Sequence, residues 1–242
     1  MRPPRICFVG GIYHVTVRCN NQEFMFKDDE DFKLFLKILL IAKVIYGVSV
    51  FGYCLTNNHV HLIVGTPNEA NLSRFMQYVN GNFAKAYNRK HGRTGRFWGG
   101  RFHSTVIESE EQFFNTLAYV ELNMVRCGAV SHPGDWRWSS YHAHAYGAND
   151  TVIDFYEMYL ALAQTPEKRR ELYRTMIAES MGEKGLTHDP VYSNGVILGS
   201  EKFVSKIVSE YGAKVPYYYK RKIYPTATSF SLYRPASSLG CG

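Results

Sequence analysis

An α+β fold is predicted by three features of the sequence. Strand-like and helical segments follow one another in the order β-α-β-β-α-β-α, which is the split β-α-β order of a ferredoxin-like domain. Hydrophobic residues make up 45% of the 242-residue chain, enough to build a core and to exclude general disorder. Beyond residue 150 capped helical segments replace the strand-like runs. We therefore expect a ferredoxin-like antiparallel sheet with helices on one side, plus a small helical C-terminal region.

Four strands are predicted from β-branched and aromatic runs and from the turn residues beside them. Residues 12–18 follow two glycines and form the first strand. Residues 48–55 and 59–64 are two apolar runs separated by Thr56-Asn57-Asn58, which indicates a hairpin. Residues 101–107 supply the fourth strand.

Two amphipathic helices are predicted between these strands. In residues 28–46 apolar residues recur at helical spacing behind an acidic start, and Gly47 follows as a stop. Residues 72–90 form the second helix, with Ser73 near its start and Gly92 past its end.

A third helix is predicted after the last strand. A capping box from Ser109 to Gln112 begins this helix, which continues to about residue 126 before Gly128 ends it. Residues 128–147 are aromatic without periodicity and are expected to form a packed loop. We therefore place one domain at residues 1–147.

The remaining residues, 148–242, are expected to be a mostly helical region with a loose tail. Thr165 and Pro166 start one helix, and residues 200–212 form another. The last 17 residues, from Thr226, are rich in Ser, Thr, Ala and Gly, which favours a loose tail.

Several classes of protein are excluded by the apolar and cysteine patterns. The most apolar stretch, residues 34–55, contains Lys37 and Lys43, which disfavours a membrane span. The N-terminus leads into strand-like sequence without a signal-peptide core. The five cysteines form no CxxC pair, so neither a disulfide framework nor a thiolate zinc site is indicated. We expect a cytoplasmic protein with no membrane partner.

The formal net charge of +7 is concentrated in one segment. Residues 73–107 contain seven basic residues and no acidic ones, and the rest of the chain carries 21 of each sign. Within this segment basic residues alternate with aromatic ones near several glycines, which suits phosphate contacts and base stacking. The alternative is a solvated basic face with aromatic residues beneath it. The predicted nucleic-acid contacts are Lys85, Arg89, Lys90, Arg93, Arg96, Trp98 and Arg101.

A His-x-His pair is the clearest candidate metal site. His59 and His61 share one face of a predicted strand, about 7 Å apart, so their imidazoles can converge on one cation. Imidazole suits Mn, Fe or Zn, and Mg is possible if oxygen ligands complete the shell. The alternative is chance, because His142 and His144 form a second such pair in irregular sequence.

A tyrosine and an asparagine share one face of the third helix. Tyr119 and Asn123 are four residues apart. A tyrosine hydroxyl can act as a covalent nucleophile and a carboxamide oxygen can bind a metal ion. The alternative is that Tyr119 belongs to a buried stripe with Leu122 and Val125.

Together these motifs resemble a known family. The chain carries His59-Val-His61 after two asparagines, the stretch Gly-Arg-Phe-Trp-Gly-Gly-Arg-Phe at residues 95–102, and Tyr119-Val-Glu-Leu-Asn-Met-Val-Arg126 followed by Trp136-Arg-Trp-Ser-Ser-Tyr141. Over about residues 5–147 it is similar to the HUH single-tyrosine transposases, in the REP-associated tyrosine transposase branch.

The resemblance implies a metal-dependent transposase and single-strand DNA endonuclease. His59, His61 and Asn123 would hold Mg or Mn, and Tyr119 would attack the DNA to give a 5′-phosphotyrosine. The partners would be single-stranded or hairpin DNA, near which the enzyme cleaves and rejoins strands. Such a protein would be a monomer or homodimer of the bacterial cytoplasm, associated with the nucleoid.

Two positions depart from the family pattern. The family often has Pro before the His-x-His and after the helix Asn, where this chain has Asn58 and Met124. The residues with chemical roles are retained, but we expect the helix to extend further than usual. Two alternatives stay open: a catalytically inactive nucleic-acid-binding regulator and a metal hydrolase that uses water.

Overall fold

A computed structural model describes residues 5–108, 111–182, 192, 196–211 and 223–225. Its centre is a six-stranded sheet with the strand order β2-β3-β1-β4-β5-β6. The first four strands in this order pair antiparallel, and β5 and β6 are added in parallel. The strands are β1 (Gly11–Arg18), β2 (Ser49–Leu55), β3 (His59–Thr66), β4 (His103–Ile107), β5 (Ile197–Gly199) and β6 (Ile223–Pro225).

Strand β1 is central because it pairs on both sides. It runs antiparallel to β3 from Gly11 opposite Thr66 to Arg18 opposite His59, and it pairs with β4 on its other edge. The predicted hairpin of β2 and β3 is present. Because side chains alternate along a strand, each strand contributes to the cores on both faces of the sheet.

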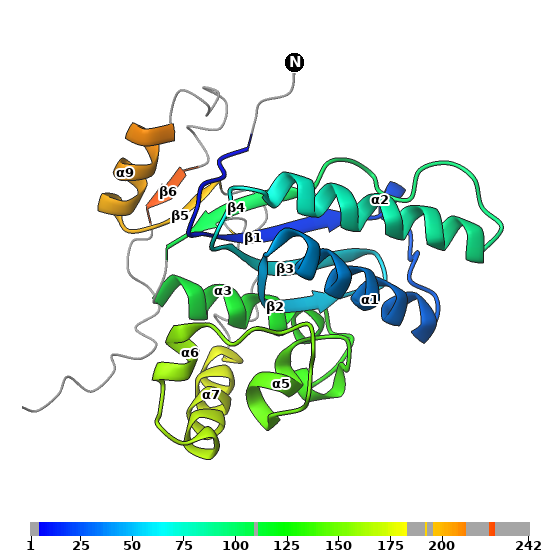
Figure 1. The fold of residues 1–242 in the computed structure, drawn as a ribbon. Helices are drawn as coiled ribbons and strands as arrows, with labels where there is room; N and C mark the ends of the chain where they lie inside the picture. The colour runs from blue at the N-terminus through cyan, green and yellow to red at the C-terminus, as the bar shows by residue number, and fades with distance from the viewer. Residues whose placement is uncertain (1–4, 109–110, 183–191, 193–195, 212–222, 226–242) are drawn as a thin grey trace, which may run out of the picture.

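Two long helices cover one face of the sheet (Figure 1). They are α1 (Asp29–Tyr46) and α2 (Leu72–Lys90), close to the predicted bounds. The side chain of Asp28 accepts a hydrogen bond from the backbone N–H of Asp31, and Gly47 ends α1 in the left-handed conformation with a φ of 57°. Both helices bury aromatic and aliphatic residues against the β1 and β3 side chains of this face.

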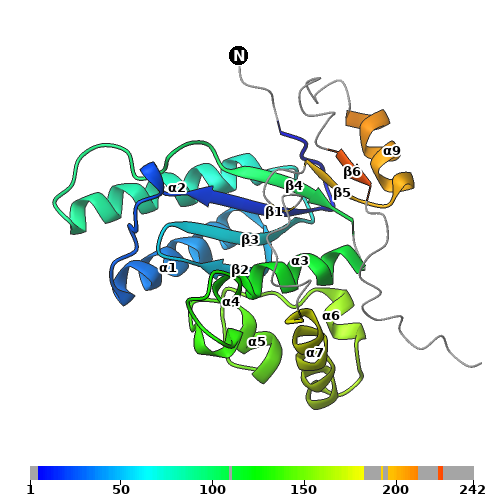
Figure 2. The ribbon, with the colours of Figure 1, turned by 180° about the vertical axis from the view of Figure 1, so that it is seen from behind.

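The third helix lies on the opposite face of the sheet, as the reverse view in Figure 2 shows. This helix, α3 (Glu111–Glu121), packs on Phe51, Cys54 and Ile63. The predicted α+β fold is confirmed, and its first four strands form the predicted antiparallel sheet. Helices α1 and α2 lie on one side of the sheet, as predicted, whereas α3 lies on the other side (Figure 1 and Figure 2).

The third helix is shorter than the sequence predicted. It ends at Glu121, and a separate turn, α4 (Asn123–Arg126), follows after Leu122 with a φ of −83° and a ψ of 5°. The prediction of one helix to about residue 126 was therefore wrong in its last turn. The predicted capping box includes residues 109 and 110, which lie outside the described residues.

The segment predicted as a loop contains a helix. Residues 128–147 include η2 (Pro133–Asp135) and α5 (Tyr141–Tyr146), so the loop prediction was wrong for these residues. Gly147 ends α5 with a φ of 73°. The buried side chains of Tyr141 and His144 hold this short helix, which has too few turns to show periodicity.

The C-terminal region is helical in part and also extends the sheet. Its helices are α6 (Glu157–Ala161), α7 (Pro166–Ser180) and α9 (Glu201–Tyr211). The Thr165 side chain caps α7, as predicted. The pairing of β5 with β4 was not predicted. The domain boundary at residue 147 stays a prediction, and the predicted loose tail from residue 226 lies outside the described residues.

Among the helices that the structure describes, none is long and apolar enough to cross a membrane.

Candidate active site

The two histidines of the His-x-His pair stand at the start of β3, on the face that α3 covers. Between them, Val60 points to the other face and is fully buried. The ring centroids of His59 and His61 are 4.8 Å apart. The strand therefore presents both imidazoles on one side, as predicted.

The structure brings Asn123 and Tyr119 to this pair. Asn123 begins α4, and its Nδ2 lies 3.1 Å from His61 Nε2. The ring of Tyr119, near the end of α3, is 5.9 Å from the ring of His61, edge on. The break after α3 thus sets the asparagine beside the histidines while the tyrosine stays on the preceding turn.

A third histidine, which the sequence analysis did not single out, completes the cluster. His14 on β1 is 1% exposed, and its Nε2 lies 2.8 Å from His61 Nδ1. Thr16, opposite His61 in the sheet, places its hydroxyl 3.3 Å from the same Nδ1 atom. The sequence pattern that could have indicated His14 is a pair of polar residues, His14 and Thr16, on one face of a strand whose other face is apolar.

The contacts define the tautomers of both candidate ligands. Asn58 Oδ1 lies 2.6 Å from His59 Nδ1 and can only accept, so His59 carries its proton on Nδ1. The Asn123 amide nitrogen donates toward His61 Nε2, so His61 also carries its proton on Nδ1 and donates it to His14 Nε2. Both imidazoles therefore keep an unprotonated Nε2.

Burial keeps these imidazoles neutral. Desolvation, with smaller contributions from the Arg18 and Arg126 charges, lowers the pKa of His59 to about 4. Burial, followed by the neighbouring His59 and His14, lowers the pKa of His61 well below its usual value. Burial also lowers the pKa of His14 to about 3. At neutral pH all three side chains are uncharged.

The donor set fits a divalent cation. Two neutral imidazoles with unprotonated Nε2 atoms flank a carboxamide, and each imidazole donates its other N–H to a fixed acceptor. The Nε2 of His61 accepts from Asn123 Nδ2, so a cation would bind there once the Asn123 amide turns its oxygen toward it. Protein metal sites commonly hold their histidine ligands in this way. Three protein ligands leave positions open for substrate oxygens and water.

The surroundings of Tyr119 are cationic and aromatic. Arg126 Cζ lies 3.9 Å from the centre of the Tyr119 ring, and Arg126 Nη2 donates to the Tyr119 carbonyl oxygen. The ring of Tyr192 stacks on the Tyr119 ring at 4.2 Å between centroids. As a result Tyr119 is only 8% exposed.

The second His-x-His pair has a different setting. His144 is 1% exposed, and its Nδ1 lies 2.8 Å from Glu121 Oε1, whereas His142 is half-buried on α5. The two imidazoles of this pair thus face different surroundings and do not converge.

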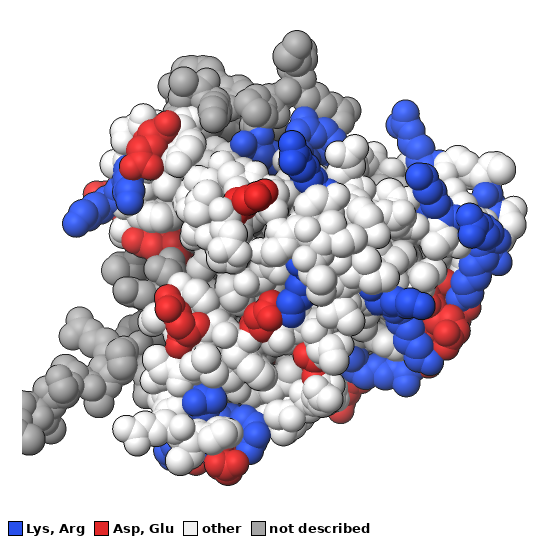
Figure 3. All heavy atoms as spheres, viewed as in Figure 1, with Lys and Arg blue, Asp and Glu red and all other residues white. Residues whose placement is uncertain are grey.

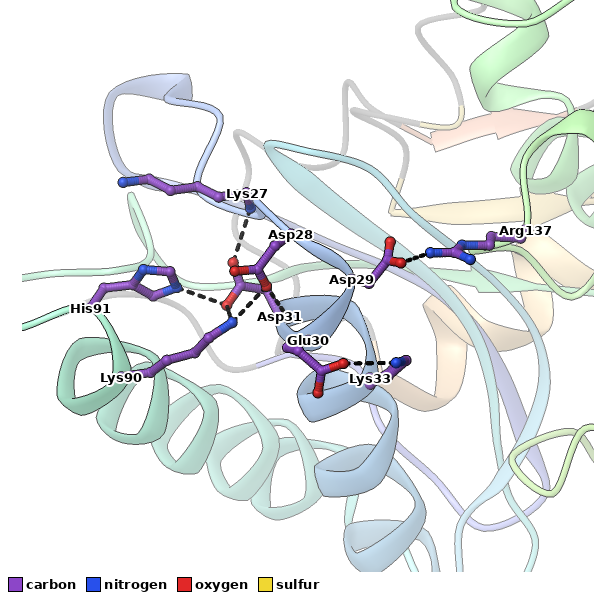
Figure 4. A network of polar contacts seen from close by, with 9 residues as sticks. All are labelled: Lys27, Asp28, Asp29, Glu30, Asp31, Lys33, Lys90, His91 and Arg137. Carbon is purple, nitrogen blue, oxygen red and sulfur yellow. Dashed lines mark hydrogen bonds and ion pairs between the residues drawn. The ribbon is translucent and has the colours of Figure 1, made fainter.

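A separate acidic group lies at the start of α1 (Figure 4). The side chains of Asp28, Asp31 and His91 approach within 4.8 Å of one another. Lys90 Nζ, however, forms ion pairs with Asp28 at 2.6 Å and with Asp31 at 2.8 Å. The Lys90 ammonium already compensates the two carboxylates, so this group joins the start of α1 to the end of α2 through ion pairs.

The predicted nucleic-acid contacts fall into two groups. The side chains of Lys85, Arg89, Arg96 and Arg101 are exposed. Figure 3 shows Lys and Arg gathered at the end of the molecule where α2 ends. The other predicted contacts are Lys90, Arg93 and Trp98. Lys90 is ion-paired, Arg93 contacts Met25 Sδ at 3.2 Å, and Trp98 donates from Nε1 to the Asn80 carbonyl. The side chains of these three residues therefore already make contacts within the protein.

The basic segment, residues 73–107, contacts the strand next to the histidines at Gly99. Gly99 donates its backbone N–H to the Arg18 carbonyl, and Arg18 lies opposite His59 in the sheet. A Cβ at Gly99 would lie 3.1 Å from the Cys19 carbonyl oxygen, so only glycine fits this approach without a shift. The charged segment and the candidate metal ligands therefore meet at the same end of β1, on its two opposite edges.

Comparison with known proteins agrees with this arrangement. Residues 7–123 match the family model described as "Transposase IS200 like". This part of the chain is therefore similar to that family. The matched range begins before β1 and ends at Asn123, so it contains His14, His59, His61 and Tyr119. The resemblance inferred from the motifs is confirmed.

Two known proteins are similar to this chain, one in sequence and one in structure. A curated protein of Haemophilus influenzae, named as a REP-associated tyrosine transposase, is 27% identical over 107 residues, which are 40% of this chain and 61% of that protein. The chain thus spans less than two thirds of that relative. The structure of a REP-associated tyrosine transposase bound to a REP hairpin has a TM-score of 0.53 at 18% identity, over 64% of this chain and 91% of that chain. This likeness shows a shared fold.

Proposed function

We propose that this protein is a divalent-metal-dependent, single-strand DNA transposase and endonuclease with Tyr119 as the nucleophile. The observation that carries the proposal is the proximity of one tyrosine, one carboxamide and two neutral imidazoles. Asn123 lies 3.1 Å from His61 Nε2, and the rings of Tyr119 and His61 are 5.9 Å apart. The transposase family model that residues 7–123 match supports the same reaction class.

His59, His61 and Asn123 would hold the cation, Mg or Mn. When bound, such an ion polarises the scissile phosphate and offsets charge on the leaving oxygen. The chain's own contribution is to fix the ligands. Asn58 and His14 hold the two Nδ1 protons, so each Nε2 would be able to bind a cation without a change of tautomer. For His61, the Asn123 amide that now donates to Nε2 would have to turn its oxygen toward the cation.

Tyr119 supplies the covalent step. Its phenolic oxygen forms a bond to phosphorus, and the bond from phosphorus to the 3′ oxygen breaks. The phenol loses its proton and the 3′ oxygen gains one, leaving a 5′-phosphotyrosine and a free 3′-hydroxyl. The reverse step with another 3′-hydroxyl rejoins strands. Arg126, 3.9 Å from the ring centre, provides a positive charge that favours the phenolate.

The substrate would be single-stranded DNA beside a hairpin. Tyr119 is nearly buried beneath Tyr192, so the contact between the two rings has to open before attack. Exposed Lys85, Arg89 and Arg96 would bind the DNA backbone.

Formation of a covalent adduct tests this proposal. The full chain is incubated with Mg or Mn and end-labelled hairpin oligonucleotides with single-stranded flanks, then analysed on a denaturing gel. We expect an adduct that is lost in Tyr119→Phe and in the presence of a chelator. Tyr146→Phe, at an exposed tyrosine on α5, is the matched control and should keep the adduct.

Two outcomes would contradict the proposal. Binding without any adduct across a varied set of hairpins would favour the alternative of a nucleic-acid-binding regulator. Strand cleavage that persists in Tyr119→Phe would indicate a metal hydrolase that uses water.

A further inference from the structure

An exposed loop lies beside the candidate active site and is not used by the mechanism above. Residues 20–24, here called the amide loop, have the sequence Asn-Asn-Gln-Glu-Phe. The loop begins with the short helix η1 (Asn20–Gln22), directly after the residues that end β1. Residues 21–24 are exposed, and Phe24 is 73% exposed.

The backbone on both sides of the loop tip is fixed. Cys19 donates its N–H to the Asn58 carbonyl, and Asn20 donates to the Phe97 carbonyl. On the far side, Phe26 and Asn57 exchange two hydrogen bonds, from the Phe26 N–H to the Asn57 carbonyl and from Asn57 Nδ2 to the Phe26 carbonyl. The side chains of the tip are therefore presented from an anchored frame.

The amide loop is one residue away from a candidate metal ligand. Asn58 Nδ2 donates to the Gln22 carbonyl, at 3.2 Å, and Asn58 Oδ1 accepts from His59 Nδ1. The other side of the loop touches the basic segment through Phe97. A nucleotide whose phosphate is held by His59 would have its base within reach of this loop.

The backbone of the tip is strained. Asn21 has a φ of 52° and Gln22 a φ of 57°, in the left-handed region that favours glycine. Two successive amide side chains are thus held where glycines would fit without strain. Such strain is concentrated at functional sites, where the side chain has a role that outweighs its conformational cost.

The chemistry of the tip suits bases rather than phosphates. Amide side chains donate to and accept from base edges, and the Glu23 carboxylate accepts from exocyclic amines but repels phosphate. An exposed aromatic ring such as Phe24 can stack on an unpaired base. Phosphate contacts give affinity, whereas base contacts give specificity.

We infer that the amide loop reads the base next to the scissile phosphate, with Asn21 and Gln22 contacting its edge and Phe24 stacking on its face. This inference rests on the proposed function. The basic segment holds the backbone, and the amide loop selects the sequence at the cleavage position.

Binding measurements separate this inference from catalysis. All variants are built in the Tyr119→Phe background without divalent cation, and fluorescence anisotropy gives the affinity for oligonucleotides that differ only in the two nucleotides at the hairpin flank. We expect Phe24→Ala to weaken binding between about 5- and 100-fold. Tyr146→Ala, at an exposed aromatic residue on α5, should leave affinity unchanged.

A double variant tests base reading without disturbing the fold. Asn21→Gly with Gln22→Gly removes both amides, keeps the carbonyl that Asn58 contacts, and relaxes the backbone, so the unfolding midpoint should not fall. We expect the spread of affinities between flank sequences to shrink at least about tenfold toward uniformity, because one bidentate base contact gives about this discrimination. The salt dependence should stay the same, since no phosphate contact is removed.

The two proposals fail in different ways. An unchanged sequence preference in the double variant, or a wild-type chain that binds all flanks equally, overturns the inference even if the Tyr119 adduct forms. Absence of the adduct in the active chain overturns the proposed function, even if the sequence preference depends on the amide loop.

Discussion

Acidification should destabilise this protein because its histidine cluster is buried uncharged. The pKa of His59 is about 4 and that of His14 about 3 in the folded chain, against an ordinary value near 6.5. Between these values the unfolded chain binds protons that the folded chain does not. By linkage, stability is therefore present above pH 6.5 and falls as the pH is lowered toward 4.

The size of the loss follows from the two pKa values. At pH 5 an imidazole with an ordinary pKa is 1.5 units below its midpoint in the unfolded chain, which corresponds to about 2 kcal/mol per histidine. His14 and His59 together should lower the free energy of unfolding by about 4 kcal/mol between pH 8 and pH 5. That is a large part of the roughly 5–15 kcal/mol that stabilises a typical domain.

Chemical denaturation with a chelator present measures this loss. Guanidinium unfolding of the wild-type chain at pH 8 and pH 5 is compared with that of His59→Gln, which keeps a polar side chain but cannot bind the proton. The variant should lose about 2 kcal/mol less than the wild type over this interval. His142→Gln removes an imidazole outside the cluster and serves as the control. Equal losses in wild type and His59→Gln would refute the assignment of a neutral, buried His59.

Two further predictions concern the metal ligands and the basic segment. His14→Phe keeps a ring in the cluster but removes the acceptor of His61, so the affinity for Mn, measured by titration calorimetry, should fall about 10- to 100-fold; an unchanged affinity would contradict the role given to His14. Arg96→Ala should reduce the slope of log affinity for single-stranded DNA against log salt by about 0.7, whereas Lys90→Ala, whose ammonium is paired with carboxylates, should change the slope less; equal changes would count against this division.

Much of the fold could be predicted from the sequence because its helices are long and are bounded by acidic or glycine residues that mark helix ends. The bounds predicted for α2 coincide with those observed. Helix α1 begins one residue after its predicted start at Asp28 and ends at the predicted Gly47 stop. The elements that were missed are short. β5 and β6 have three residues each, so they exist only because β4 offers an edge on which to pair.

The sequence predicted the residues of the candidate site only as two separate pairs. Strand and helix periodicity place His59 beside His61 and Tyr119 beside Asn123, but not one pair near the other. The meeting of the two pairs depends on α3 crossing the face opposite α1 and on the break at Leu122, and both are set by tertiary packing. Local sequence cannot specify these features.

The helix that carries Tyr119 is anchored by residues that follow the range matched by the family model. Glu121 lies between Tyr119 and Asn123 and is 1% exposed. Its Oε1 accepts from Ser140 at 2.6 Å, and its Oε2 accepts from the Tyr173 hydroxyl at 2.6 Å. A buried carboxylate is tolerable only while such donors satisfy it.

This anchor gives the C-terminal region a structural role in the candidate active site. Ser140 and His144, which contact Oε1, lie at the start of α5 and within it, and Tyr173 belongs to α7, so all three partners come from segments after residue 123. A chain cut at the expected domain boundary, residue 147, would keep Ser140 but lose Tyr173. One oxygen of Glu121 would then lose its donor, directly beneath the turn that carries Tyr119 and Asn123. The positions of Tyr119, the proposed nucleophile, and of Asn123 are therefore supported by α7, although α7 supplies no residue to the proposed reaction.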